Sequence, residues 1–319
     1  YGTSGSTLSF GIRENNFNGK GIKLDTNLAL SEETIKGMFV YTHPNFAYSD
    51  RALTTSIEST VTDKVKDYGY KTSLNSFSLG TSYEQYEDVF FSPSFSISSE
   101  SLTTTTDASD NYKKQEGSYF DTYFDYAITY DKRNSPYRPT EGFRSNWSQS
   151  LPVLSDGPAI LNSYAITGYK EIIDDMVFSA GFFGRSIKSV GDKDVRVSKR
   201  LYLPRQKLRG FESGKVGPKD GNDFVGGNYM TSFNTSTTVP YILQTLENID
   251  LKLFFDAANV WGVDYSSSIE DSNKIRSSVG AAVEVLTPVG PLSFSLAQPI
   301  TKATGDKTET FRFQLGTTF

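Results

Sequence analysis

The 319-residue sequence predicts an all-β protein, a transmembrane antiparallel up-and-down β-barrel of about 16 strands. Three observations predict this fold. Roughly fifteen short segments alternate apolar and polar residues, as strands with one apolar and one polar face do. No run of about eighteen apolar residues is present, so no membrane helix is expected. Aromatic residues make up 14% of the chain, and they gather near the ends of the segments, where membrane barrels place interfacial girdles.

The first half of the chain contains seven predicted strands. They are Ser6–Glu14, Gly21–Ala29, Thr34–Thr42, Ala52–Thr62, Lys71–Tyr83, Val89–Glu100 and Tyr119–Tyr130. The last of these alternates most clearly, because Phe120 and Phe124 share one parity and Asp121 and Asp125 share the other. Ser101–Gln115 is predicted to be a polar loop, and no helical segment is expected between the strands.

The second half contains eight predicted strands. They are Phe143–Leu154, Ala159–Ile173, Met176–Val190, Asn228–Val239, Ile249–Ala258, Ser277–Leu286, Gly290–Gln298 and Glu309–Phe319. In the fifth of these segments, Phe254 and Asp256 share the polar parity. Alternate residues of a strand point to opposite faces, so both side chains are expected to face inward.

Leu201–Gly227 is the longest segment without strand-like alternation. Prolines and glycines interrupt it and exclude a regular helix or strand: Pro204, Gly210, Gly214, Gly217, Pro218 and Gly221. Apolar residues such as Leu208 and Phe211 give it anchors, so disorder is not expected. Loops of this length are uncommon in ordered domains unless they have a function. We therefore expect a long loop that folds onto another part of the protein.

The polar faces of the strands distinguish a membrane barrel from a soluble sandwich or propeller. They carry full charges, among them Asp125 and Lys252. Such charges suit a water-filled lumen, whereas a soluble sandwich would bury the apolar faces against one another. A fixed repeat, which a propeller requires, is not visible. The barrel is therefore the favoured fold.

The composition excludes several kinds of site. The chain has no Cys, one His and a net charge of −5, which argues against disulfides, thiolate or multi-His metal sites, imidazole catalysis and nucleic acid as a partner. His43 lies near Ser49 and Asp50 in sequence, but proximity in sequence does not make a catalytic triad. The stretch from Asp220 to Asp223 hints at calcium but lacks the EF-hand spacing. No enzyme activity, cofactor or metal is expected.

Several stretches together resemble the BamA superfamily of outer-membrane assembly and secretion barrels. Leu208-Arg209-Gly210-Phe211 is similar to its (V/I)-R-G-(F/Y) signature, and Phe254–Trp261 is similar to its aromatic-Asp strand. The other matching stretches are Arg138–Gly142, Gly217-Pro218, Val225–Asn228, Ile275-Arg276, Leu286–Leu292, Ala297–Pro299 and Gly305–Lys307. The resemblance is strong over residues 119–319 and weaker over residues 3–118. A lone RGF motif would be a weak signal, but the set is specific.

The resemblance implies that residues 1–319 are one outer-membrane barrel domain whose first strand is truncated. The POTRA domains and the signal peptide are expected to be absent from this chain. The family's sixth loop folds into the lumen, where the signature arginine meets an aspartate and an aromatic residue of an inner wall. Here these are Arg209, Asp256 and Phe254. Relatives often add a carboxylate from the strand after the loop, but Tyr229–Pro240 contains no Asp or Glu, so a simpler contact is expected.

The resemblance also implies a function. It is the folding and insertion of β-barrel client proteins into the bacterial outer membrane through a lateral seam between the first and last strands. The expected partners are unfolded outer-membrane proteins, accessory lipoproteins of an assembly complex and outer-membrane lipid. The gate residues would lie in the C-terminal strand: Phe311, Phe313, Leu315, Gly316 and Phe319. Two alternatives remain, a two-partner secretion transporter that exports one substrate through the lumen and a passive porin.

Overall fold

The computed structural model describes residues 8–31, 33–65, 69–106, 108–136, 138–221, 223–240, 249–265, 269, 273–287 and 290–315. Fifteen strands form one antiparallel sheet in chain order. They are β1 (Leu8–Phe17), β2 (Ile22–Leu30), β3 (Thr34–His43), β4 (Ala52–Lys64), β5 (Tyr70–Tyr86), β6 (Val89–Thr104), β7 (Gly117–Asp131), β8 (Glu141–Ser155), β9 (Ala159–Ile173), β10 (Met176–Ser189), β13 (Tyr229–Thr238), β14 (Ile249–Trp261), β15 (Arg276–Thr287), β16 (Gly290–Thr301) and β17 (Phe311–Leu315). The predicted all-β class is confirmed.

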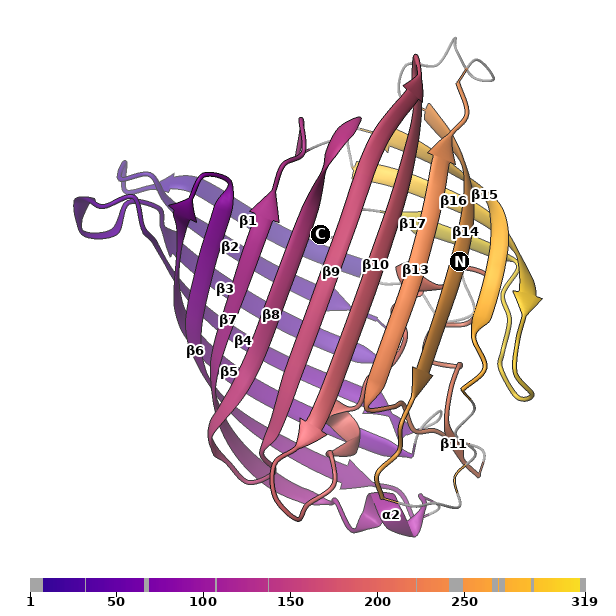
Figure 1. Cartoon of the computed structure of the whole chain (residues 1–319). Coiled ribbons are helices and arrows are strands. Elements are labelled where there is room, and N and C mark those ends of the chain that lie inside the picture. Colours follow the sequence, from indigo (N-terminus) through magenta and orange to yellow (C-terminus); the bar gives the residue numbers. More distant parts are fainter. Residues whose placement is uncertain are drawn as a thin grey trace.

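Figure 1 shows that the sheet curves strongly, so that the early strands in indigo lie behind β8, β9 and β10 across an interior. Phe120 and Phe124 of β7 are 49% and 40% exposed, whereas Asp121 between them is 2% exposed. The apolar parity thus faces outward and the charged parity faces the interior, opposite to the arrangement in a soluble sandwich. Among the described residues, no helix is long and apolar enough to span a bilayer.

The connections between strands differ widely in length. Two-residue turns join β5 to β6 and β9 to β10, with left-handed φ angles of 62° at both Asp88 and Asp175. The longest connection, residues 190–228 between β10 and β13, lies at the opposite end of the sheet. Because neighbouring strands are antiparallel and fifteen is odd, β1 and β17 run in the same direction.

The buried apolar core lies around the loop of residues 190–228, which includes the small hairpin of β11 (Lys219–Asp220) and β12 (Asp223–Phe224). Leu208 and Phe211 belong to one cluster with Met230 of β13 and Val260 of β14. A second cluster joins Val197 of the loop to residues of β5 and β6, namely Tyr70 and Leu102. The predicted long loop therefore folds onto the inner wall of the sheet.

The connection between β6 and β7 differs from prediction in two respects. The predicted polar loop Ser101–Gln115 is shorter, because β6 continues to Thr104 and pairs there with Tyr70. The rest of it contains α2 (Asp110–Lys113), a single helical turn whose N-cap Ser109 accepts a hydrogen bond from the Tyr112 backbone. The expectation of no helical segment is therefore wrong at this point. Figure 1 places α2 beside β11, consistent with a 3.3 Å hydrogen bond from Asn111 Nδ2 to Asp220 Oδ2.

Candidate functional site

Arg209 of the loop is held by Asp256 on the inner face of β14. Arg209 Nε donates to Asp256 Oδ2 at 2.7 Å, and Nη2 donates to Oδ1 at 2.8 Å. The Arg209 backbone N–H also donates to Oδ2 at 3.1 Å. Asp256 is fully buried. A bidentate guanidinium–carboxylate pair of this kind fixes both the position and the orientation of the loop.

Three further side chains complete this contact. The Phe254 ring centroid lies 3.4 Å from the Arg209 guanidinium carbon, an arrangement that attracts a cation to the ring. Asn234 of β13 donates Nδ2 to Asp256 Oδ1 at 2.8 Å and to the Lys207 carbonyl at 3.0 Å. Ser278 Oγ donates to the Arg209 carbonyl at 2.5 Å. Asn234 thus supplies an amide donor to Asp256 from the strand after the loop. It was not predicted from the sequence, because only Asp and Glu were considered there.

The other signature residues place the loop against four strands, Gly210 against β15 and β16 and the two apolar residues against β13 and β14. Gly210 has a φ of 87°, and a Cβ there would lie 3.2 Å from Ala297 Cβ and 3.3 Å from Ser278 Cβ. A left-handed backbone and this close approach both favour glycine. Leu208 and Phe211 on either side are buried in the cluster that joins the loop to β13 and β14. The structure therefore brings together all six residues predicted for the loop contact.

Arg312 of β17 joins the last strand to the loop. Arg312 Nη1 donates to the Arg205 carbonyl at 2.6 Å, and Nη2 donates to the Phe211 carbonyl at 2.7 Å. Arg312 Nη2 also lies 3.0 Å from Glu309 Oε2. The Glu309 backbone N–H donates to the Gly210 carbonyl at 3.1 Å. Arg312 was not predicted as a site residue, although it alternates with Phe311 and Phe313 and was therefore expected to face the interior.

The predicted gate residues are only partly described. Phe311 is exposed on the outer face, and the Phe313 ring lies 4.9 Å from the ring of Phe294 on β16. Leu315 pairs through its backbone with Leu292. Gly316 and Phe319 lie outside the described residues. Within the described part of the chain, β17 pairs with β16 along its length and its other edge carries no strand.

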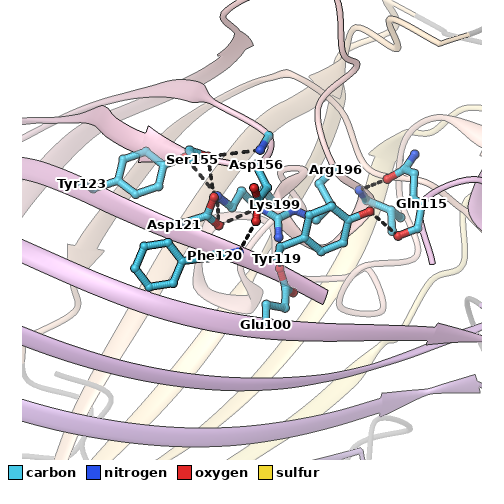
Figure 2. Close-up of polar contacts among 12 residues, drawn as sticks. Glu100, Gln115, Tyr119, Phe120, Asp121, Tyr123, Ser155, Asp156, Arg196 and Lys199 are labelled. Carbon is cyan, nitrogen blue, oxygen red and sulfur yellow. Dashed lines mark hydrogen bonds and ion pairs between the residues drawn. The ribbon is translucent and has the colours of Figure 1, made fainter. Parts of the chain in front are cut away.

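The amino-terminal half of the loop meets the wall formed by β6 and β7, seen in Figure 2. Arg196 Nη1 donates to Glu100 Oε2 at 2.8 Å, and Arg196 Nη2 donates to Asp121 Oδ2 at 2.6 Å. Lys199 Nζ donates to the same Asp121 oxygen at 2.6 Å. Sequence reasoning placed Asp121 in the lumen without a partner, because periodicity does not reveal contacts across an interior.

A further ion pair ties this half of the loop to the connection between β14 and β15. Asp264 accepts hydrogen bonds from Arg200 Nη2 and, at 2.9 Å, from Asn228 Nδ2. Burial acts to raise the pKa of the Asp264 carboxyl, but the charge and hydrogen bond of Arg200 and the bond from Asn228 outweigh it, so the pKa lies below its ordinary value. Asp264 is therefore held as a carboxylate at neutral pH.

The remaining sequence candidates do not form a site. Among the described residues, no hydrogen bond joins His43 to Ser49 or Asp50; Ser49 Oγ donates instead to the Phe46 carbonyl at 2.7 Å. Asp220 accepts from Asn111 and Tyr265, and Asn222 lies outside the described residues. Within the described ranges, no group of three or more His, Cys, Asp and Glu side chains is arranged to hold a metal ion.

Comparison with known proteins gives a consistent set of relatives. A family model described as the Omp85 superfamily domain matches residues 16–319. The chain is 24% identical over 380 residues to the outer membrane protein assembly factor BamA of Neisseria meningitidis, covering 99% of this chain and 45% of that protein. It is 26% identical over 209 residues to the human sorting and assembly machinery component 50 homolog, covering 61% of this chain and 45% of that protein. The chain thus spans less than half the length of these relatives.

Solved structures show the same fold. The crystal structure of BamA from Haemophilus ducreyi lacking POTRA domains 1–3 matches with a TM-score of 0.87 and 24% identity, covering 98% of this chain and 68% of that one. CdiB from Acinetobacter baumannii matches with a TM-score of 0.63 and 13% identity, covering 98% of this chain and 57% of that one. At these identities the likeness concerns the fold alone.

Proposed function

Because this chain belongs to the Omp85 superfamily, we propose that it closes into an outer-membrane barrel that folds and inserts other β-barrel proteins. Its location is the bacterial outer membrane, since the relatives that match most of the chain are bacterial outer membrane protein assembly factors. The observation that carries the proposal is the internal loop, which Arg209 fixes to Asp256 and Arg312 joins to the last strand. The proposed partners are unfolded outer-membrane clients and accessory lipoproteins.

The direction of the edge strands supports closure with one further strand. β1 and β17 run in the same direction, so they cannot pair with each other in an antiparallel barrel. An unpaired edge is strongly disfavoured in lipid, because water is not present to satisfy its backbone groups. One more strand placed between β1 and β17 would complete an antiparallel barrel of sixteen strands. This strand would come from residues other than 8–315. The sequence predicts about 16 strands, and the described residues supply fifteen of them.

The proposed mechanism is strand exchange at the seam beside β17. If the contact between β17 and the closing strand opens, the backbone N–H and C=O groups of that edge become available to a client. A client strand can then pair with them, as in other cases of β-augmentation. Local thinning of the membrane beside the seam would lower the barrier to insertion. No covalent bond is made or broken, so the activity requires no catalytic residue and no cofactor.

Two alternative functions have less support. A passive porin keeps a wide aqueous lumen, whereas here the loop of residues 190–228 crosses the interior and packs against its inner wall. A secretion transporter shares this fold, as the match to CdiB illustrates, but the sequence relatives that cover most of the chain are outer membrane protein assembly factors. The internal loop and these sequence relatives therefore support assembly.

Depletion of the protein is expected to lower the amounts of many unrelated outer-membrane β-barrel proteins together, measured by quantitative proteomics of isolated outer membranes. Inner-membrane proteins serve as the control and should not change. Expression of the intact protein from a second gene copy should restore the barrels. Loss of one exported protein alone would indicate secretion instead, and unchanged outer-membrane proteins with a reduced uptake of small solutes would indicate a porin.

A further inference from the structure

A buried charge cluster joins the amino-terminal half of the loop to β6 and β7. The Arg196 side chain is 3% exposed, and those of its partners Glu100 and Asp121 are 8% and 2% exposed. Figure 2 shows Arg196 lying between these two carboxylates. Exposed ion pairs contribute little to stability. A buried pair differs, because removing one partner leaves a charge in a dry environment.

The cluster is balanced in charge and shielded by aromatic rings. Two cations, Arg196 and Lys199, face the two carboxylates of Glu100 and Asp121. The guanidinium of Arg196 lies 3.9 Å from the Tyr119 ring centroid, and Lys199 Nζ donates to Tyr123 Oη at 2.9 Å. Arg196 Nε is buried without a hydrogen-bond partner, but the charge-assisted bonds of Arg196 and Lys199 to the two carboxylates still hold these side chains against the wall.

The backbone beside Arg196 is also attached to this wall. The short 3-10 turn η2 (Val197–Lys199) begins at Val197, whose N–H donates to Gln115 Oε1 at 2.7 Å. The Val197 side chain is fully buried in the cluster that contains Tyr70 and Leu102. The charged residues and the apolar contact therefore hold the same short stretch of the loop.

This attachment lies far around the sheet from the Arg209 contact. Four strands, β8, β9, β10 and β13, separate β7 from β14 in the sheet. We propose that Arg196 is a positioning residue that forms a second, separate anchor. The loop is then attached at two places on the inner wall, to β6 and β7 through Arg196 and to β14 through Arg209. Because Arg312 bonds to this loop, the loop links the last strand to β6 and β7. The anchor follows from the contacts alone, and only its consequence at the seam rests on the proposed function.

The two anchors can be tested separately with cysteine reporters, because the sequence contains no cysteine. Val197→Cys reports on the amino-terminal half of the loop and Val216→Cys on the carboxy-terminal half; both valines are buried. Maleimide labelling is measured in isolated outer membranes that contain the whole protein. Arg196→Gln is expected to raise the labelling rate at position 197 at least ten-fold and at position 216 less than two-fold. Asp256→Asn is expected to raise the labelling rate at position 216 at least ten-fold and at position 197 less than two-fold.

The controls separate a positioning role from a general loss of structure. Arg196→Lys keeps the charge and should restore slow labelling in part. Lys170→Gln, in an exposed ion pair with Glu141, should change neither rate. Unchanged labelling at position 197 in Arg196→Gln, or equal increases at both positions, would overturn the proposal. If Arg196→Gln does not reach the membrane in a heat-modifiable form, Glu100→Gln, which leaves the Asp121 contact intact, decides by the same two rates. These outcomes do not depend on whether the protein assembles clients.

Discussion

Asp256→Asn is expected to remove most of the assembly activity while the sheet still folds. The substitution keeps the shape of the side chain but replaces a carboxylate oxygen that accepts hydrogen bonds with an amide that donates them. Arg209 and Asn234 both donate to that carboxylate, so a partly buried guanidinium, 21% exposed, loses its buried partner. Breaking one side of a buried ion pair typically costs about 3–5 kcal/mol. That cost is enough to release the loop from β14.

The activity of Asp256→Asn is measured by complementation of a depletion strain, with heat-modifiable mobility as the test of folding. Glu141→Gln is the matched control, because it breaks an exposed pair with Lys170 at 3.0 Å that is worth about 1 kcal/mol at most. Arg209→Lys should fall between the two, since lysine keeps the charge but cannot form the bidentate contact. Full complementation by Asp256→Asn would show that the loop contact is dispensable.

Arg312→Gln is expected to loosen the last strand without unfolding the rest of the sheet. The substitution removes the guanidinium donors to the Arg205 and Phe211 carbonyls and removes the ion pair with the Glu309 carboxylate. Hydrogen bonds that involve a charged group contribute about 1.5–3 kcal/mol each. We therefore expect amide hydrogen exchange in residues 311–315 to become at least ten-fold faster.

Arg13→Gln is the matched control for Arg312→Gln. Arg13 lies on β1, the other edge strand, and pairs with Asp25, but its side chain is 70% exposed. Its loss should change exchange in β1 by much less. Equal exchange of residues 311–315 in Arg312→Gln and the unaltered protein would contradict the proposed tie between the last strand and the loop.

Most of the fold could be predicted because the side-chain period of a strand is visible in the sequence. The alternation of Phe120 and Phe124 with Asp121 correctly assigned the outer and inner faces of β7. The extension of β6 to Thr104 could not be predicted, since the polar residues there have no clear alternation and their pairing with Tyr70 depends on the neighbouring strand.

The contacts across the interior could be predicted only in part. Arg209, Phe254 and Asp256 were identified by resemblance to a family signature, and parity alone placed the last two inward. Arg196 lies 96 residues from Glu100 and 75 from Asp121, and no local pattern connects positions so far apart. Asn234 was not predicted, because only Asp and Glu were considered as further partners in this contact. Its amide instead donates a hydrogen bond to the Asp256 carboxylate.

Photo-cross-linking of newly made outer-membrane proteins to the last strand tests most directly whether β17 is the seam. Phe311 on β17 and Phe182 on β10 are both exposed on the outer face, at 48% and 41%, so they form a matched pair of positions for a photo-reactive residue. We expect adducts with several client proteins at position 311 and none above background at position 182. Equal cross-linking at the two positions, or no adduct at position 311 while clients assemble normally, would contradict it.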